Sequence, residues 1–235
     1  MTQPLSIAVV MPVLNEARRI DDALQHLQQI GGWQELIVVD GGSTDATAAI
    51  VAARHPNVRV ILARPGRANQ MNAGAAVATA DVIVFLHADV VLPATAVDDI
   101  RVALRDSATV GGAFRTWTIA DGPTIAPWWA PLLHLADVRS RYTRRPYGDQ
   151  AIFVRASTFA RLGGYAEIPL MEDLEFSSRL AKRGKVRTVA SRVEVSGRRF
   201  IARPFFYTTV VNLFPLLYRC GVAPKTLAAL YGRVR

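Results

Sequence analysis

The stretch SIAVVMPVLNE, residues 6–16, begins as a short apolar run rich in valine and ends in polar residues. Comparable runs occur later in the first hundred residues, at 35–40 (ELIVVD), 58–62 (VRVIL) and 81–87 (DVIVFLH). Runs of this length that are rich in Val and Ile are typical of buried, parallel strands. We therefore expect four such strands, the first over Ser6–Met11.

Helical patterning fills the intervals between these strands. Ile20, Leu24 and Leu27 recur at i, i+4 and i+7, and Gly31-Gly32 ends that pattern. Further helices are expected over residues 44–53, 68–78 and 94–105. The order β-α-β-α predicts an α/β fold with a parallel sheet covered by helices on both faces. Ligands of such sheets bind at the carboxyl ends of the strands, so these ends form the candidate site.

Composition limits the class of protein. The 235 residues are 51% hydrophobic and 20% charged, which excludes a disordered chain, a collagen-like repeat and a disulfide scaffold. The single Cys220 cannot form an internal disulfide and favours a reducing compartment. The net charge of +9 is uneven: residues 1–138 carry a net −4, and residues 139–235 carry +13. The basic half fits a phosphate-rich ligand, an anionic lipid surface or nucleic acid, or else is a solvated basic face.

No membrane span or signal peptide is predicted, and we expect a cytoplasmic protein. The longest uncharged run in the basic half is Pro204–Tyr218, which has 15 residues, whereas a spanning helix needs about 20. The start of the chain lacks a basic stretch followed by an apolar one. The apolar and basic tail over 204–235 either covers the core, forms a homodimer interface or lies against the inner face of a membrane.

The first strand ends in Pro12-Val13-Leu14-Asn15-Glu16. A dinucleotide-binding fold requires Gly-x-Gly-x-x-Gly at this place, and its absence counts against a nicotinamide or flavin enzyme. Glu16 either faces a nucleotide or is a first-turn acid favoured by the helix dipole.

The second strand ends in Asp40-Gly41-Gly42-Ser43-Thr44-Asp45. A carboxylate at the strand tip can accept hydrogen bonds from a base or ribose, and the two glycines allow backbone to approach a ligand. Ser43 or Thr44 is expected to cap the next helix, whose amide end favours phosphate. The alternative is a glycine turn followed by an ordinary helix cap.

The fourth strand ends in His87-Ala88-Asp89. Alternate residues of an extended segment point the same way, so His87 and Asp89 are expected on one side. Asp89 can offer oxygen to Mg²⁺ or Mn²⁺, with further oxygens from a nucleoside diphosphate. Imidazole suits softer metals better than Mn²⁺, so His87 can instead contact ribose or phosphate.

Taken in order, residues 12–16, 39–45 and 87–89 resemble the motifs of family-2 glycosyltransferases, which have the Rossmann-like GT-A fold. The resemblance extends to Met171-Glu172-Asp173-Leu174, similar to the family's Glu-Asp motif, and to Ser196-Gly197-Arg198-Arg199-Phe200, near its Gln-x-x-Arg-Trp segment. The family's Asp-x-Asp is His87-x-Asp89 here. Leu86–Asp89, Gly148–Gln150 and Gly221–Pro224 further resemble a bacterial subgroup of short arsenosugar-biosynthesis-type glycosyltransferases.

The resemblance implies roles for individual residues. Asp173 would be the catalytic base, and Asp89 would bind the divalent metal, Mn²⁺ or Mg²⁺. The donor-binding residues would be Pro12, Asn15, Glu16, Asp40, Gly41, Ser43, Asp45, Arg64, Asn72, His87 and Ala88. The acceptor- or phosphate-binding residues would be Asp149, Gln150, Glu172, Arg198 and Arg199.

The residues around Asp173 are compatible with that role. A loop after Leu162-Gly163-Gly164-Tyr165 leads to a helix that starts at Glu172 and places Asp173, Phe176 and Leu180 on one face. A carboxylate within reach of an acceptor hydroxyl can take its proton. The alternative is a pair of first-turn acids favoured by the helix dipole.

We therefore expect one GT-A domain over 1–235. Residues 1–110 would bind the nucleotide sugar, 111–203 the acceptor, and 204–235 would form a helical tail. The expected function is metal-dependent, inverting transfer of a sugar from a nucleotide donor to an acceptor hydroxyl, without nucleic acid as a partner. The alternatives are transfer to a polyprenyl phosphate at a membrane surface, and nucleotide binding without catalysis.

Overall fold

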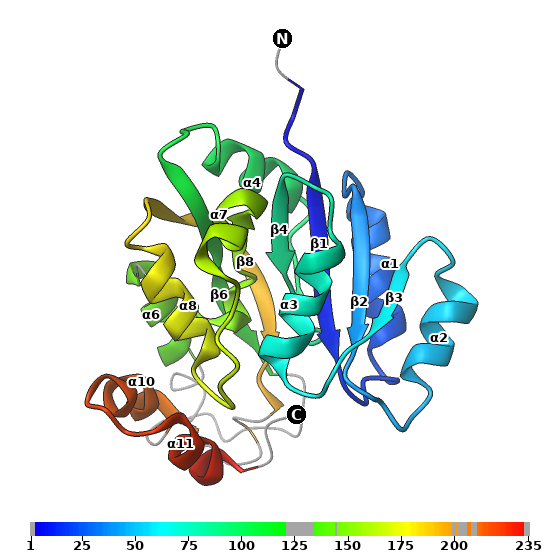
Figure 1. Ribbon diagram of the computed structural model, residues 1–235. Helices are drawn as coiled ribbons and strands as arrows, with labels where there is room; N and C mark the ends of the chain where they lie inside the picture. Colours follow the sequence, from blue (N-terminus) through cyan, green and yellow to red (C-terminus); the bar gives the residue numbers. More distant parts are fainter. Residues whose placement is uncertain are drawn as a thin grey trace.

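A computed structural model of the chain describes residues 3–120, 134–143, 145–198, 201, 206–207 and 211–232. One eight-stranded sheet, in the order β3-β2-β1-β4-β7-β6-β8-β5, runs through it with helices on both faces (Figure 1). The strands are β1 (Ile7–Val13), β2 (Glu35–Asp40), β3 (Arg59–Leu62), β4 (Val82–Phe85), β5 (Val90–Val91), β6 (Thr109–Ile119), β7 (Phe153–Arg155) and β8 (Lys185–Ser196). The helices are α1 (Ile20–Ile30), α2 (Thr47–Arg54), α3 (Arg67–Val77), α4 (Ala96–Ala103), α6 (Leu135–Tyr142), α7 (Ala156–Leu162), α8 (Glu172–Leu180), α10 (Val211–Arg219) and α11 (Pro224–Tyr231), and η1 (Gly148–Gln150) is a single 3₁₀ turn.

The first half of the chain forms the parallel part of the sheet. β1 pairs in parallel with both β2 and β4, so that Val10 lies opposite Ile37 on one side and Phe85 on the other. All seven residues of β1 are buried, as the unbroken apolar run predicts. The four expected strands are confirmed, and their carboxyl ends meet at one edge of the sheet.

The second half extends the same sheet with mixed strand directions. β7 is antiparallel to both β4 and β6, while β8 runs parallel to β6. Glycine allows this close pairing: a Cβ on Gly112 would lie 2.2 Å from the carbonyl oxygen of Arg187. The first six residues of β6, Thr109–Phe114, are all buried.

The two faces of the sheet pack against different helices. Alternate residues of β1 point to opposite faces, so Val9 and Met11 join the core under α1, α2 and α4. Val10 joins the core under α3, α7 and α8. In Figure 1, α3, α7 and α8 cover the near face of the sheet.

The helix ends match the sequence in part. Gly31, at φ +67°, ends α1 as the glycine pair predicts, and Gly163, at φ +73°, ends α7. The expected cap by Ser43 or Thr44 is wrong, because α2 begins three residues later, after Ala46. The Ser43 hydroxyl donates instead to Asp40 at 2.7 Å, because that strand-end carboxylate lies closer than the helix.

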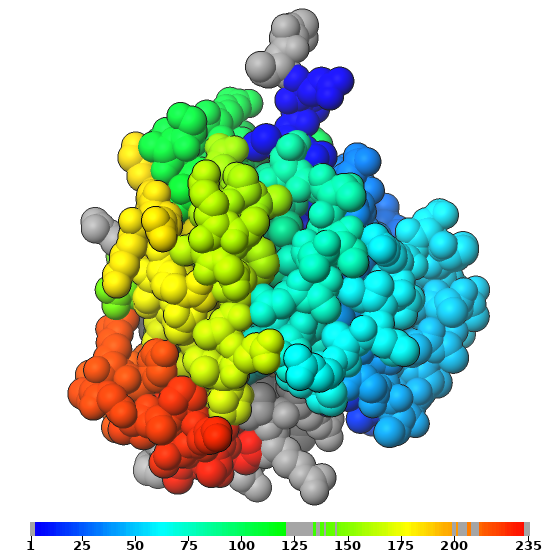
Figure 2. Space-filling view, viewed as in Figure 1, coloured from blue at the N-terminus to red at the C-terminus, as the bar shows by residue number. Residues whose placement is uncertain are grey.

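The C-terminal helices pack beside α8. Phe214 of α10 and Leu227 of α11 are fully buried and form a cluster with Leu170, which precedes α8. Figure 2 shows this tail, in orange and red, gathered at one corner against the yellow segment. Leu213 and Leu216 remain more than half exposed on the other side of α10. In the part of the chain that the structure describes, no helix is long and apolar enough to cross a membrane.

Candidate active site

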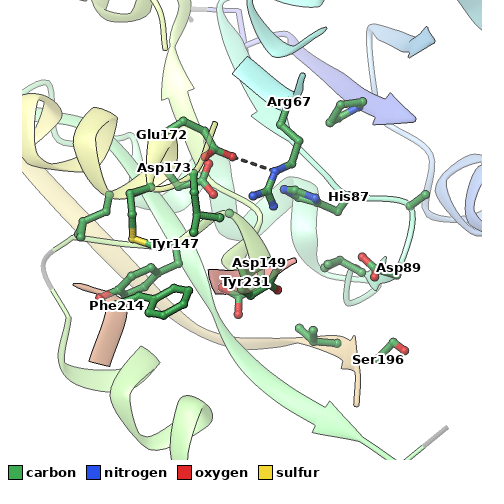
Figure 3. Close-up of a pocket in the computed structure, with 18 of the residues that line it drawn as sticks. Arg67, His87, Asp89, Tyr147, Asp149, Glu172, Asp173, Ser196, Phe214 and Tyr231 are labelled. Atoms are coloured by element: carbon green, nitrogen blue, oxygen red, sulfur yellow. Dashed lines mark ion pairs between the residues drawn. The ribbon is translucent and has the colours of Figure 1, made fainter. Parts of the chain in front are cut away.

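A cavity of about 320 Å³ opens at the sheet edge where β1 and β4 end. It is lined by strand-end loops, by the start of α3, by η1 and the start of α8, and by the C-terminal helices. Its charged or aromatic lining residues are Glu16, Arg67, His87, Asp89, Tyr147, Asp149, Glu172, Asp173, Tyr207, Phe214 and Tyr231. The labelled side chains of Figure 3 come from both halves of the chain.

Glu172 and Asp173 stand at the first turn of α8. The helix is held in place by Leu174, Phe176 and Leu180, which are at most 1% exposed. Met171 precedes the helix at φ +71°, and its left-handed backbone turns the chain into it. The predicted apolar stripe is thus confirmed, and it fixes two acidic side chains at the rim of the core.

Arg67 provides the positive charge at the centre of the site. Its Nε lies 2.9 Å from Oε1 of Glu172, whose side chain is 2% exposed (Figure 3). No aligned hydrogen bond reaches the Glu172 carboxylate within the described residues, so charge holds this pair together. Burial lowers the pKa of Arg67, but the carboxylates of Glu172 and Asp173 outweigh it and hold that pKa above its ordinary value.

Asp173 has the electrostatics of a proton acceptor at neutral pH. Burial, followed by the charge of Glu172, raises the pKa of Asp173 to about 7, against the opposing influence of Arg67. Its Oδ1 is buried and accepts no hydrogen bond from the described residues. A carboxylate with such a pKa can take a proton from a bound hydroxyl, as a general base does.

Gly148 brings the middle of the chain close to Asp173. A Cβ at this position would lie 2.3 Å from Oδ2 of Asp173 and 2.9 Å from Nε2 of His87, so only glycine fits. The backbone amide of Gly148 hydrogen-bonds the Asp173 carboxylate. The strand-end histidine of β4 and the acid of α8 therefore face each other across one backbone segment.

Gln150 holds the turn around Gly148 in place through hydrogen bonds to the backbone. Its Oε1 accepts a hydrogen bond from the Tyr147 amide at 3.0 Å, and its Nε2 donates to the Phe114 carbonyl at 2.9 Å. Gln150 is 1% exposed and does not line the cavity, whereas Tyr147 and Asp149 do. The structure thus places Asp149 in the site and gives Gln150 a supporting position.

Asp89 and Ser196 mark the other end of the cavity (Figure 3). Oδ2 of Asp89 lies 3.6 Å from Nη2 of Arg198, and the Asp89 side chain is 25% exposed. The hydroxyl of Ser196 is buried and has no hydrogen-bond partner among the described residues. Pro12, Glu16, His87 and Ala88 also line the cavity, as predicted for donor-binding residues, but Arg198 does not, and Arg199 lies outside the described residues.

Four predicted donor-binding residues instead join two loops to each other. The backbone amide of Asn15 donates a hydrogen bond to the Ser43 hydroxyl at 2.9 Å. Oδ1 of Asp40 accepts hydrogen bonds from the amide and the hydroxyl of Ser43. Asp45 accepts hydrogen bonds from Thr47 and from the Ala17 amide. None of Asn15, Asp40, Ser43 and Asp45 lines the cavity.

Three further predictions fall outside the cavity. Gly41 packs against Gln70, whose Cδ would lie 2.9 Å from an added Cβ. Asn72 clamps the backbone of Tyr165 through both ends of its amide, at 2.8 and 2.9 Å. Arg64 is exposed on the loop before α3, and Arg67, three residues later, is the arginine that enters the site.

Sequence reasoning missed the arginine and most of the aromatic lining. Arg67 follows Gly66, a position that marks a helix start, but no spacing rule distinguishes it from Arg64. Tyr207, Phe214 and Tyr231 lie in the C-terminal tail. The sequence shows that this tail is apolar, but it does not show that the tail lines the cavity. A stretch rich in proline and tryptophan, residues 127–131 (PWWAP), lies outside the described residues.

The described residues offer few protein ligands for a metal. They contain no group of three or more His, Cys, Asp or Glu side chains placed to hold an ion. Asp89, with the orphaned Ser196 hydroxyl beside it in the same lining, fits an ion that takes most of its ligands from a bound molecule and water. Mg²⁺ in nucleotide sites is typically held in this manner, by one or two carboxylates and substrate phosphates.

Comparison with known proteins gives a consistent result. The family model described as "Glycosyl transferase family 2" matches residues 8–158. The glucosyl-3-phosphoglycerate synthase of Mycobacterium tuberculosis is 32% identical over 97 residues, which are 37% of this chain and 30% of that protein. The match to this relative therefore spans less than a third of its length.

Solved structures share the fold. The mannosyltransferase PcManGT from Pyrobaculum calidifontis, in complex with GDP-Man and Mn²⁺, superposes with a TM-score of 0.65 at 22% identity, over 95% of this chain and 67% of that one. S. aureus TarS 1-349, in complex with UDP-GlcNAc, gives a TM-score of 0.62 at 16% identity, over 83% of this chain and 59% of that one. These neighbours confirm the expected α/β fold with a mostly parallel sheet, which is the GT-A fold.

Proposed function

The chain belongs to glycosyl transferase family 2, and we propose that it transfers a sugar from a nucleotide-sugar donor to an acceptor hydroxyl with inversion at the sugar carbon. One observation carries the proposal: Asp173, with a pKa of about 7 and a buried Oδ1 that accepts no hydrogen bond from the described residues, lines the same cavity as Asp89. A single displacement needs one base on the acceptor side and charge stabilisation on the leaving-group side. The two ends of the cavity match these two needs.

Asp173 would accept the proton of the acceptor hydroxyl at its unbonded Oδ1. The Gly148 amide hydrogen-bonds the Asp173 carboxylate, and Oδ1 accepts no hydrogen bond from the described residues. Glu172 keeps the Asp173 pKa high, while Arg67 holds the Glu172 carboxylate in place at 2.9 Å. The chain thus prepares one carboxylate to be ionised and receptive near pH 7.

A divalent cation, Mn²⁺ or Mg²⁺, would be held by Asp89 together with the donor's own diphosphate oxygens. Five carboxylates line the described part of the cavity, so a free diphosphate would be repelled without a compensating cation. When bound, the ion neutralises charge that develops on the leaving diphosphate. Ser196, Glu16 and His87 also line the cavity and would orient the nucleotide.

We also propose that residues 1–110 serve mainly the donor and residues 111–203 mainly the acceptor, with 204–235 as a helical tail. The segments Leu86–Asp89, Gly148–Gln150 and Gly221–Pro224 support membership in the short arsenosugar-biosynthesis-type subgroup. That label leaves the acceptor open. Donor and acceptor are therefore sought by screening rather than assumed.

The test is release of nucleoside diphosphate from a panel of nucleotide sugars, each with Mn²⁺, Mg²⁺ or EDTA. We expect release from at least one donor, its loss in EDTA, and inverted anomeric configuration of the product by NMR. A retained configuration would exclude the single displacement, and full activity in EDTA would exclude the metal. Binding of nucleotides without release from any donor would support the non-catalytic alternative.

A further inference from the structure

The C-terminal helices α10 and α11 have a buried side and an exposed side. Phe214 and Leu227 are fully buried and pack with Leu170, so both helices are held against the segment that precedes α8. Leu213 and Leu216 of α10 are 52% and 57% exposed. Residues three positions apart are neighbours on a helix surface, so these two leucines form one apolar patch that is open to solvent.

Exposed basic side chains follow this patch in the sequence. Arg219 stands in the last turn of α10, three residues after Leu216, and Lys225 stands in the first turn of α11. We call Leu213, Leu216, Arg219 and Lys225 the tail strip. Leucines together with Lys or Arg on the surface of a helix are typical of helices that lie at the interface of a membrane.

The sequence around the tail strip carries charge of one sign. From Ser196 to the last residue it contains seven Lys or Arg residues and no Asp or Glu. The seven are Arg198, Arg199, Arg203, Arg219, Lys225, Arg233 and Arg235. Charges of one sign that are concentrated in one segment attract a partner with many charges of the opposite sign, here negative ones.

An anionic bilayer complements both the leucines and the cations of the tail strip. Lipid phosphates pair with the basic side chains, while leucine side chains enter the boundary between headgroups and acyl chains. Nucleic acid would complement the charge but would leave the leucines in water. A second copy of the chain would bring the same patch of each subunit together, so that like charges approach each other and repel.

The tail strip lies close to the cavity without forming part of it. Phe214 of α10 and Tyr231 of α11 line the cavity, whereas the four residues of the tail strip do not. Figure 2 shows α10 and α11, in orange and red, at an outer corner of the molecule. An α-helix with its side chains is about 10 Å thick, so a surface bound to the tail strip would lie about one helix diameter from the cavity lining.

We propose that the tail strip docks the protein on the surface of an anionic phospholipid bilayer. The contact is peripheral and reversible, because two leucines bury little apolar surface and no helix of the described residues is long and apolar enough to cross a membrane. Docking would hold the cavity near the layer of lipid headgroups. Lipid binding needs no turnover, so its failure and the failure of the proposed function are separate results.

The experiment is co-sedimentation of the full chain with two kinds of vesicle, phosphatidylcholine alone and phosphatidylcholine mixed equally with phosphatidylglycerol. Leu213→Ser/Leu216→Ser removes the leucines of the tail strip, and Arg219→Gln/Lys225→Gln removes its cations. All four side chains are exposed, so the variants should fold, and thermal unfolding checks that they do.

Two control variants make the same kinds of change elsewhere on the surface. Lys182→Gln/Arg183→Gln removes two exposed cations that follow α8, at the end of that helix away from the tail. Leu62→Ser/Val102→Ser changes two apolar residues that are 77% and 53% exposed and lie outside the tail. Comparison with these controls separates docking through the tail strip from general adsorption of a basic protein.

We expect the unaltered chain to bind the phosphatidylglycerol vesicles much more than phosphatidylcholine alone, and to bind less at about 0.5 M salt than at about 0.1 M. Each variant of the tail strip should weaken partitioning by about tenfold or more, because leucines and cations both contribute. The two control variants should partition like the unaltered chain.

Unchanged binding of both tail-strip variants, equal losses in the controls, or no preference for anionic vesicles would overturn the inference. Sedimentation velocity gives the remaining outcome that would overturn it. A dimer that Leu213→Ser/Leu216→Ser dissociates, in a chain that binds no vesicles, would assign the tail strip to a second copy of the chain.

Discussion

Asp45 and Asp173 are both acidic residues at loop–helix junctions, yet their pKa values are shifted in opposite directions. Asp45 loses some contact with water, which raises its pKa, but hydrogen bonds from Thr47 and the Ala17 amide lower that pKa below its ordinary value. Asp173 has one backbone hydrogen bond and an acidic neighbour, and its pKa rises to about 7. Asp45 therefore has a structural role, with its carboxylate fully hydrogen-bonded, whereas Asp173 keeps a raised pKa and can accept a proton.

The same contrast holds for the surroundings of the two residues. The loops after β1 and β2 hydrogen-bond each other through Asn15, Ser43 and Thr44, and Asp40 accepts hydrogen bonds from Gly42 and Ser43 of its own loop. In the cavity lining, Asp173 Oδ1 and the Ser196 hydroxyl have no hydrogen-bond partner among the described residues. Buried polar groups without partners cost free energy, so these two groups in the cavity lining fit a site that is completed by a ligand.

Asp173→Asn gives the sharpest test of this contrast. Loss of the base should reduce diphosphate release by about 10²- to 10⁴-fold. The folded protein should be no less stable, because the substitution removes a charge next to Glu172. Steady-state kinetics and thermal unfolding measure the two effects. Asp45→Asn is the matched control and should keep its activity; equal losses in both variants would erase the distinction between the two aspartates.

Arg67→Met should lower the free energy of unfolding by about 3 kcal/mol, because it leaves the buried Glu172 carboxylate without its cation. Chemical denaturation measures this change. Arg64→Met, on the exposed loop before the same helix, serves as the control and should be nearly neutral. The double variant Arg67→Met/Glu172→Gln should recover part of the loss, and failure to recover any would contradict the ion-pair explanation.

Gln70→Leu tests the hydrogen bonds that join the ends of β1 and β2. The Gln70 side chain is 3% exposed and donates to the Val13 and Val39 carbonyls at 2.7 and 2.9 Å, joining the ends of β1 and β2. Leaving both carbonyls without a donor should cost about 2 kcal/mol of stability. Urea unfolding would measure it, with the exposed Gln29→Leu as control. A neutral result would mean that these strand ends are held by the sheet alone.

Activity and stability should both depend on pH through the titration of Asp173. Activity should rise about tenfold between pH 6 and pH 8, as Asp173 with a pKa of about 7 loses its proton. Stability should move the other way: the folded pKa lies above the ordinary value of 3.8, so the contribution of Asp173 falls as the pH rises from about 4 to about 7. Metal-free denaturation curves across this range, with Asp173→Asn as reference, measure it. An identical slope in the variant would assign the titration elsewhere.

Asp45→Ala should have the smallest effect, about 1 kcal/mol of stability. Because its folded pKa is below the ordinary 3.8, its contribution is present above that pH and is lost as the solution becomes more acidic. Thermal unfolding at pH 7 and at pH 3 compares the variant with the unaltered chain. A difference that grows at pH 3 would contradict the hydrogen-bonded carboxylate.

Local patterns were enough to predict much of the fold. The apolar runs predicted the parallel strands, and the Gly31-Gly32 pair predicted the end of α1, because strand burial and left-handed backbone depend on neighbouring residues. The stripe of Phe176 and Leu180 likewise placed Asp173 at the start of a helix. Each of these features depends on residues that lie two to seven positions apart in the sequence.

Only the tertiary structure decided which residues meet. Arg67, Gly148, Asp173 and Tyr231 come from four separate segments, and sheet order together with helix packing brings them to one cavity. The sequence equally suggested ligand contacts for Asp40, whose hydrogen bonds turn out to be internal. Burial and the direction of a side chain depend on contacts between distant segments, and no local spacing encodes them.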